Sequence, residues 1–368
     1  MKTAVLQFIR REPILIVSAL AALVSCCFVP PDGAYLGYID LRTLALLYAL
    51  MLVVEGLRGA GAFDLLAHAA LQRAKTVRTM GLLLVALSFF SAMLITNDVA
   101  LLTFVPFALL LPGMTARVNE LILIVALQTV AANLGSMLTP VGNPQNLYLY
   151  SNYGLSAADF FTITVPFWLL SLLLVLLLCF LLPRAPLENP SSDAPTLDRR
   201  ALGLYGALLV VCLLAVFRVL GWPLMLLLVV AVLLALDRKM LLRADFMLLL
   251  TFVAFFVFAG NLARLGAVDR LLRRLLLGRE YLAALLASQV ISNVPSALLL
   301  SGFTDNARDL VLGVDIGGLG TPIASLASLI SLKLYSRAEG ARTGRYLVVF
   351  TLLSLALLAV LSAARLLV

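Results

Sequence analysis

Charged residues are scarce in this chain of 368 residues. Asp, Glu, Lys and Arg together make up 12% of it, whereas an average soluble domain carries about 25%. Hydrophobic residues make up 63%, and the mean hydropathy is +1.09. Apolar stretches recur from one end to the other, with the roughly 17 to 25 residues that cross about 30 Å of hydrocarbon. The composition therefore excludes a soluble globular protein and predicts an all-α polytopic membrane protein.

Residues that usually carry enzyme chemistry are also few. Histidine occurs once, at His68, and the four cysteines are Cys26, Cys27, Cys179 and Cys212. The cysteines lie in apolar runs without a C-x-x-C pair, which is typical of buried core residues rather than of disulfides or metal ligands. One histidine supports neither a metal cluster nor a Ser-His-Asp triad, and no Walker A motif is present. We therefore expect no enzyme and no cofactor, apart from sodium or a proton as a coupling ion.

The net charge of +8 does not indicate nucleic-acid binding. Lys and Arg are scattered among short hydrophilic connections, the pattern that holds loops on the cytoplasmic side of a membrane. Arg10 and Arg11 precede the first apolar run, which we interpret as an uncleaved transmembrane helix with a cytoplasmic N-terminus. We expect a multi-pass protein of the inner (cell) membrane whose partners are the lipid bilayer and a small solute.

The longest hydrophilic interval is "PRAPLENPSSDAPTLDRR" at 183–200. Its Pro, Ser and mixed charges predict a flexible connector. We therefore divide the chain into a first half at 1–182, the connector at 183–200, a linking transmembrane helix at 201–220 and a second half at 221–368.

Three motifs occur in the same order in both halves. "GAFD" (61–64) corresponds to "GAVD" (266–269), and "ITND" (95–98) corresponds to "ISNV" (291–294). "NLGSMLTPVGNPQN" (133–146) corresponds to "DIGGLGTPIASLAS" (315–328). Such an ordered set indicates an internal repeat. The first motif opens an amphipathic segment in each half, and we expect His68 to lie on its solvated polar face.

The second motif predicts a re-entrant hairpin in each half, with tips at Thr96 and Asn97 and at Ser292 and Asn293. Their hydroxyl and carboxamide groups can exchange hydrogen bonds with an anion or coordinate a small cation. The alternative is two ordinary spans joined by a short turn.

The third motif predicts a broken helix in each half. Gly135 and Gly317 allow close backbone approach, and Pro140 and Pro322 end the preceding helical segment. The following segment then offers free N–H groups to an anion. Matched breaks of this kind indicate a secondary transporter whose site lies at mid-membrane. The alternative is a proline kink with polar residues buried between helices.

Asp98 follows the first tip, and Asp315 opens the third motif of the second half. A carboxyl group at mid-membrane binds a proton or sodium readily, because desolvation disfavours the bare charge. The alternative for each is a helix N-cap. Glu55 and Arg218 are weaker candidates, since a long side chain near a helix end reaches the interface.

At these motifs the chain resembles the ion transporter superfamily, particularly its arsenite-pump and sodium/proton-antiporter branch, with citrate and dicarboxylate carriers as more distant relatives. "TNDVALLTFVP" (96–106) is similar to the first hairpin of arsenite permeases, and "VDIGGLGTPIASLASLISLKLY" (314–335) to their second opening motif. "GSMLTPVGNPQNLYLY" (135–150) is closer to the carboxylate carriers. The second tip departs from those carriers, with Ser-Asn-Val where they tend to have Ser-Asn-Thr.

The resemblance implies an inverted repeat with two re-entrant hairpins, often dimeric, in which one part carries substrate past a scaffold like an elevator. The linking helix at 201–220 gives the odd number of crossings that this inversion requires, which places the C-terminus outside. Basic residues of several connections then fall inside, as the positive-inside rule requires. They are Arg10, Arg11, Arg73, Lys75, Arg78, Arg238, Lys239, Arg243, Lys333, Arg337, Arg342 and Arg345. The Arg-rich segment 264–279 (Arg270, Arg273, Arg274 and Arg279) falls outside and disagrees, so we assign it to an interfacial amphipathic helix.

The leading hypothesis is a secondary active transporter of a small anion or oxyanion, arsenite-like or carboxylate-like, coupled to protons or sodium and working as a homodimer. A sodium/proton antiporter is second, a channel third and an intramembrane enzyme last. The predicted site has a possible sodium position near Asn97 and Asn293. Its residues are Thr96, Asn97, Asp98, Thr139, Gly142, Asn143, Asn146, Ser292, Asn293, Asp315, Thr321 and Ser325.

Overall fold

The structure, a computed structural model, describes residues 12–110, 114, 117–187 and 195–367, so Arg10 and Arg11 lie outside the described residues. Within these ranges the regular structure is helical and contains no strand. Six helices are long and apolar enough to cross a membrane, and a pair bent by 50° makes a seventh if it counts as one span. The chain is an all-α polytopic membrane protein, as its composition predicts.

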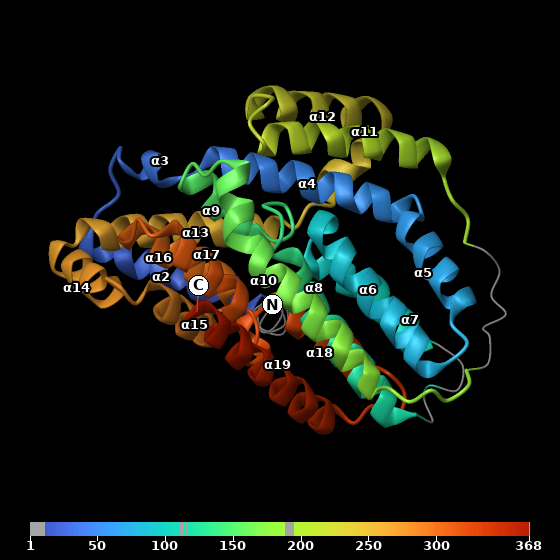
Figure 1. The fold of residues 1–368 in the computed structure, drawn as a ribbon. Coiled ribbons are helices and arrows are strands. Elements are labelled where there is room, and N and C mark those ends of the chain that lie inside the picture. The colour runs from blue at the N-terminus through green and yellow to red at the C-terminus, as the bar shows by residue number, and fades with distance from the viewer. Residues whose placement is uncertain (1–11, 111–113, 115–116, 188–194, 368) are drawn as a thin grey trace, which may run out of the picture.

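The first half runs from α2 to η1, and its helices α6, α7, α8 and α10 lie side by side in Figure 1. Its elements are α2 (Pro13–Phe28), α3 (Tyr35–Tyr38), α4 (Leu41–Gly59), α5 (Ala62–Arg73), α6 (Val77–Ile95), α7 (Asn97–Leu110), α8 (Val118–Ser136), α9 (Pro144–Asn152), α10 (Ala157–Leu178) and the 3-10 turn η1 (Cys179–Leu181).

The single helix α11 (Arg199–Val216) occupies the predicted linking segment. The second half follows with its elements in the same order. They are α12 (Trp222–Leu236), η2 (Arg238–Leu242), α13 (Phe246–Arg264), α14 (Gly266–Leu276), α15 (Glu280–Ile291), α16 (Asn293–Leu300), η3 (Ser301–Phe303), α17 (Ala307–Gly317), η4 (Pro322–Ala324), α18 (Leu326–Ser336) and α19 (Thr343–Arg365).

Short polar side chains start several of these helices. Asp40, Thr76, Asp198 and Asp245 each accept a hydrogen bond from a backbone N–H in the first turn of α4, α6, α11 and α13. Ser156 forms a reciprocal capping box at the start of α10. Such caps satisfy N–H groups that have no partner inside the helix. These caps therefore determine the residue at which each helix begins.

At both predicted tips two helices meet in a hairpin with the same backbone geometry, and the re-entrant course of each hairpin in the membrane stays a prediction. Thr96, between α6 and α7, has φ 70° and ψ 151°. Ser292, between α15 and α16, has φ 75° and ψ 156°. A side chain at positive φ is uncommon, and it lets the chain reverse direction within one residue. The start of α6 and the start of α8 both bond to residues 183–187, so α6 and α7 leave from one end of the molecule and return to it.

The two halves exchange packing partners. α2 packs on α13, and α12 packs on α4; α9 packs on α16, and α18 packs on α7; α8 packs on α19, and α17 packs on α10. Figure 1 shows α11 and α12 lying along α4. Such reciprocal pairs are expected for repeats related by a pseudo-two-fold axis. The inversion of that axis relative to the bilayer stays a prediction.

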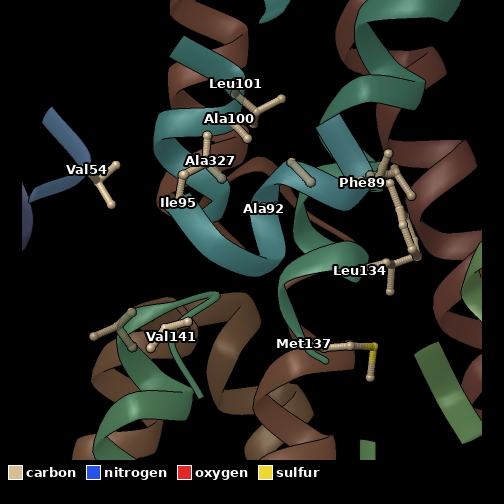
Figure 2. Packing of buried hydrophobic residues seen from close by; sticks show 14 of the residues in the cluster. Val54, Phe89, Ala92, Ile95, Ala100, Leu101, Leu134, Met137, Val141 and Ala327 are labelled. Carbon is tan, nitrogen blue, oxygen red and sulfur yellow. The ribbon is translucent and has the colours of Figure 1, made fainter. Parts of the chain in front are cut away.

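Apolar side chains from both halves enclose the first hairpin tip. Ile95 and Ala100, on either side of the tip, lie close to Ala327 of α18 in Figure 2. Val141 comes from the segment between α8 and α9. All four are at least 97% buried. The tip therefore reaches into the core of the molecule.

The amphipathic segment α5 differs from the prediction at His68. This side chain is 8% exposed, and its Nε2 atom lies 2.8 Å from Nε2 of Gln72. The expectation of a solvated face is wrong because α5 packs against α6 and α7, which cover it. In the corresponding helix α14, Leu271 and Leu275 are more than half exposed beside arginines, as an interfacial helix requires.

Equivalent glycines let each broken helix touch its own hairpin. A Cβ atom on Gly135 would lie 2.0 Å from the carbonyl oxygen of Phe89 in α6, and one on Gly317 would lie 2.9 Å from Cα of Leu285 in α15. Both obstacles are backbone atoms, so neither can move aside as a flexible side chain would. These contacts fix the breaks against the hairpins.

We predict that Gly135→Ala lowers the free energy of unfolding in detergent by about 1 to 3 kcal/mol, because the added methyl group overpacks the α6–α8 contact. Gly203→Ala in α11 is the matched control, since nothing lies within 4 Å of its Cβ position. The control should be neutral or stabilising by up to about 1 kcal/mol. Equal melting temperatures for the two variants would contradict the close contact.

Candidate functional site

Asn133, near the end of α8, joins the first tip to the second half. Its Oδ1 accepts hydrogen bonds from Nδ2 of Asn97 (3.1 Å) and from Oγ of Ser325 (2.9 Å). Its Nδ2 donates to Oγ of Ser328 at 3.2 Å. All four side chains are at most 4% exposed. The network therefore links α7 and α8 to the start of α18 inside the core.

Asp315, near the end of α17, has the equivalent position in the second half. Its Oδ1 accepts hydrogen bonds from Nδ2 of Asn143 (3.1 Å) and Nε2 of Gln145 (3.5 Å). The Asn146 amide faces the same carboxyl group. Asp315 lies in the last turn of its helix, so it caps no helix N-terminus. The structure thus argues against the capping alternative for this residue.

The two networks are reciprocal. Asn133 bonds to residues that follow the break of the second half, and Asp315 bonds to residues that follow the break of the first half. The repeat pairs Asn143 with Ser325 and Asn146 with Ser328. Each half therefore contributes hydrogen bonds to the polar side chains of the other. The first half supplies mostly amides, and the second supplies hydroxyls and the carboxyl group.

Two buried oxygens of this network have no hydrogen-bond donor among the described residues. They are Oδ2 of Asp315 and Oδ1 of Asn146, whose residues are 3% and 0% exposed. A buried polar atom without a partner costs roughly 1 to 3 kcal/mol, more when it is charged. Carboxylate and amide oxygens are ligands for a proton or a small cation. No group of three His, Cys, Asp or Glu side chains suited to a metal occurs in the described part of the chain.

Gly142 and the tip asparagines act partly through the backbone. The N–H of Asn97 donates to the carbonyl of Gly142 at 3.2 Å, and a Cβ on Gly142 would lie 2.0 Å from the carbonyl oxygen of Ser136. Oδ1 of Asn97 accepts from its neighbour's N–H, and Oδ1 of Asn293 does the same at 2.9 Å. Nδ2 of Asn293 lies beside Gly318, and no hydrogen bond joins it to Asp315 in the described chain. The structure brings the first tip into the network but leaves Ser292 and Asn293 beside it.

Thr139 and Thr321 are turned away from the network. The Thr139 hydroxyl donates to the carbonyl of Met93 in α6 at 2.5 Å. The Thr321 N–H and hydroxyl donate to Oε1 and the carbonyl of Gln289 in α15, at 2.9 and 3.4 Å. These threonines tie each break to the first leg of its own hairpin. Both are predicted site residues that the structure places in a positioning role.

Gln289 was missed by the sequence reasoning. Its Nε2 donates to the carbonyls of Gly317 (2.7 Å) and Leu319 (2.9 Å), so it satisfies backbone groups freed by the second break. The signal that could have identified Gln289 is a carboxamide in an otherwise apolar helix, three residues before the tip. Asn133, which begins the third motif, was missed as well.

A cavity of about 220 Å³ lies between α4, the first tip, the α8–α9 break and the start of α13. Thr96, Asp98 and Asn143 line it, together with Arg243 and Asp245 from the second half. Asp98 faces this cavity, whereas Asp315 lies in the buried network. The two carboxyl groups therefore belong to separate parts of the candidate site.

Comparison with known proteins identifies the family to which the chain belongs. The family described as citrate transporter matches residues 5–309. The inner membrane protein YbiR of Escherichia coli is 36% identical over 308 residues, which are 80% of each chain. An uncharacterized transporter of Methanocaldococcus jannaschii, MJ0456, is 32% identical over 84% of this chain and 85% of its own.

A more distant relative has a solute in its name. The silicon efflux transporter LSI3 of rice is 32% identical over 153 residues, which cover 41% of this chain and 31% of the rice protein. The family match covers most of the chain, and an uncharacterized transporter is more than 30% identical to it. Both findings agree with the broken helices and hairpins of the structure. The chain belongs to the citrate transporter family of membrane transporters.

Proposed function

We propose that the protein is a secondary active transporter of a small anion or oxyanion, coupled to protons or sodium. The observation that supports this most is the reciprocal network of Asn133 and Asp315 at two helix breaks. Amide donors around a single carboxyl group suit an oxygen-rich solute that binds together with a cation. The family name and the silicon efflux relative both indicate such oxygen-rich solutes.

We further propose that the protein is a homodimer of the inner membrane, that it works by an elevator motion and that its C-terminus lies outside. The resemblance of the motifs to the ion transporter superfamily supports the elevator motion and the homodimer. The name of the Escherichia coli relative supports the inner membrane. Helix α2 packs on α13, and α12 packs on α4. This reciprocal packing supports a repeat in which these four helices form a scaffold, and the hairpins and broken helices form a second unit beside it.

A sodium/proton antiporter is the second candidate. The unpartnered Oδ2 of Asp315 and the cavity-facing Asp98 favour it, because two desolvated carboxyl groups can exchange a proton for sodium without an anion.

Purified protein in proteoliposomes distinguishes the candidates. Uptake is measured for arsenite, dicarboxylates and sulfate under sodium and proton gradients, alongside sodium/proton exchange without added anion. We expect saturable uptake of one anion that an ion gradient drives uphill. Sodium/proton exchange with no anion uptake would select the antiporter, and flux that never accumulates solute would indicate a channel.

We predict that Asn97→Ala reduces initial uptake at least about tenfold, because it breaks the bond between the tip and Asn133 inside the core (roughly 1.4 kcal/mol per factor of ten). Asn293→Ala should act similarly, through the second tip. Asn152→Ala is the control, since Asn152 is exposed at the end of α9. Size-exclusion profiles establish folding, and normal uptake by both tip variants would refute the assignment of the tips.

We predict that Asp315→Asn removes the dependence of uptake on the coupling ion while the protein stays folded. The amide keeps the size of the side chain but removes the charge that a proton or sodium neutralises. The readout is the slope of uptake against sodium concentration and against pH. Asp305→Asn in an exposed loop serves as control. An unaltered slope in Asp315→Asn would exclude this carboxyl group from coupling.

A further inference from the structure

A second hollow of about 540 Å³ adjoins the cavity at the first tip. The two hollows share Glu55 and Leu102 in their walls. The second is also lined by Arg58 and Asp64, at the end of α4 and in α5. The two hollows are therefore neighbours, with the side chains of Glu55 and Leu102 at their common boundary.

One face of α7 runs along both hollows. Asp98 and Leu102 line the inner hollow, and Leu102, Pro106 and Leu110 line the outer one. These residues recur every four positions and therefore share a helix face. At 1.5 Å per residue the stripe is about 18 Å long. That length extends from the tip to the end of α7, at the end of the molecule where the hairpin enters.

Acidic side chains outnumber basic ones in the walls of the two hollows. The acidic residues are Glu55, Asp64, Asp98 and Asp245, and the basic residues are Arg58 and Arg243. Both arginines approach the same Glu55 carboxyl group, at 3.7 and 3.8 Å, and all three side chains are at least 32% exposed. No described basic residue forms an ion pair with Asp64, Asp98 or Asp245. A cleft of this sign concentrates cations and repels free anions.

Among the described residues, the cavity at the second tip has a different lining. Ser292 lines a cavity of about 400 Å³ whose other walls include Val17, Phe255 and Leu299 and contain no charged residue. The structure is therefore asymmetric: a polar space reaches the first tip, and an apolar one lies beside the second.

We propose that the two hollows along α7 are the route by which a small cation, sodium or a proton, reaches Asp98. Glu55 and Asp245 attract the cation, and Arg243 and Arg58 at Glu55 limit its residence there. The route opens at the end of α4, which the basic residues Arg73 and Lys75 of the next connection assign to the cytoplasm. This inference deepens the proposed function and depends on it for the coupling role of the cation.

Thiol labelling tests the route without any transported solute. Cys26 and Cys27 are first replaced by Ser, while the buried Cys179 and Cys212 stay. Leu102→Cys places a thiol where the hollows meet, and Phe107→Cys places a second one in the outer hollow. Leu299→Cys, beside the second tip, is the matched control. The reagents are two membrane-impermeant methanethiosulfonates of similar size, one a trimethylammonium cation and one a sulfonate anion.

We expect the cation to modify Leu102→Cys at least about tenfold faster than the anion, after correction for their rates with a free thiol. Glu55→Gln together with Asp245→Asn should bring this ratio close to one. Asn replaces Asp as a helix cap at little cost, so α13 should remain intact. Leu299→Cys should stay unmodified. Equal rates for the two reagents, or no reaction at Leu102→Cys and Phe107→Cys in folded protein, would overturn the route.

Oriented vesicles test the assigned side. Modification from the cytoplasmic face alone supports the inference, and modification from the outer face refutes it. A protein that shows the expected labelling but transports no solute would disprove the proposed function while the cation route stands. Normal coupled uptake without a charge preference in labelling would disprove only the route.

Discussion

Backbone groups exposed by a broken helix inside a bilayer need partners from the protein itself, because hydrocarbon offers none. This constraint explains most of the polar residues in the core. Gln289 serves the carbonyls of Gly317 and Leu319 at the second break. At the first break, Thr164 donates to the carbonyl of Leu138 and Asn146 to that of Met137. The polar side chains whose hydrogen bonding is incomplete after this requirement is met are the ones that we propose for solute or cation binding.

The same constraint binds the two halves into one unit. Asn133 and Asp315 each bond to the segment that follows the other half's break. The glycines that place each broken helix against its hairpin also hold these two side chains in position. Neither half has a complete polar core by itself, so the site forms only when both have folded and met.

Composition predicted a polytopic membrane protein, and the order of the motifs predicted the helix reversals and the helix breaks. These could be predicted because Gly, Pro and Asn within an apolar run usually mark a turn or a broken helix. The order of the motifs also predicted that Asn97, Asn143 and Ser325 gather. It did not predict that Thr139 and Thr321 turn toward the hairpin legs, since a hydroxyl bonds whichever carbonyl lies nearest once the helices pack. Nor did spacing indicate Arg243 and Asp245 beside Asp98, because that contact joins distant helices whose relative position only packing decides.

The repeat is symmetric in shape but not in charge. Where the first half has the neutral Asn133, the second has Asp315. In a central unit that moves through the membrane, the bare Asp315 carboxyl group would add one negative charge, and a bound monovalent cation would neutralise it. The membrane field acts on a unit charge with about 2.3 kcal/mol per 100 mV. In the proposed transporter, this single Asn-to-Asp difference between the halves would make the empty and the loaded forms respond differently to voltage.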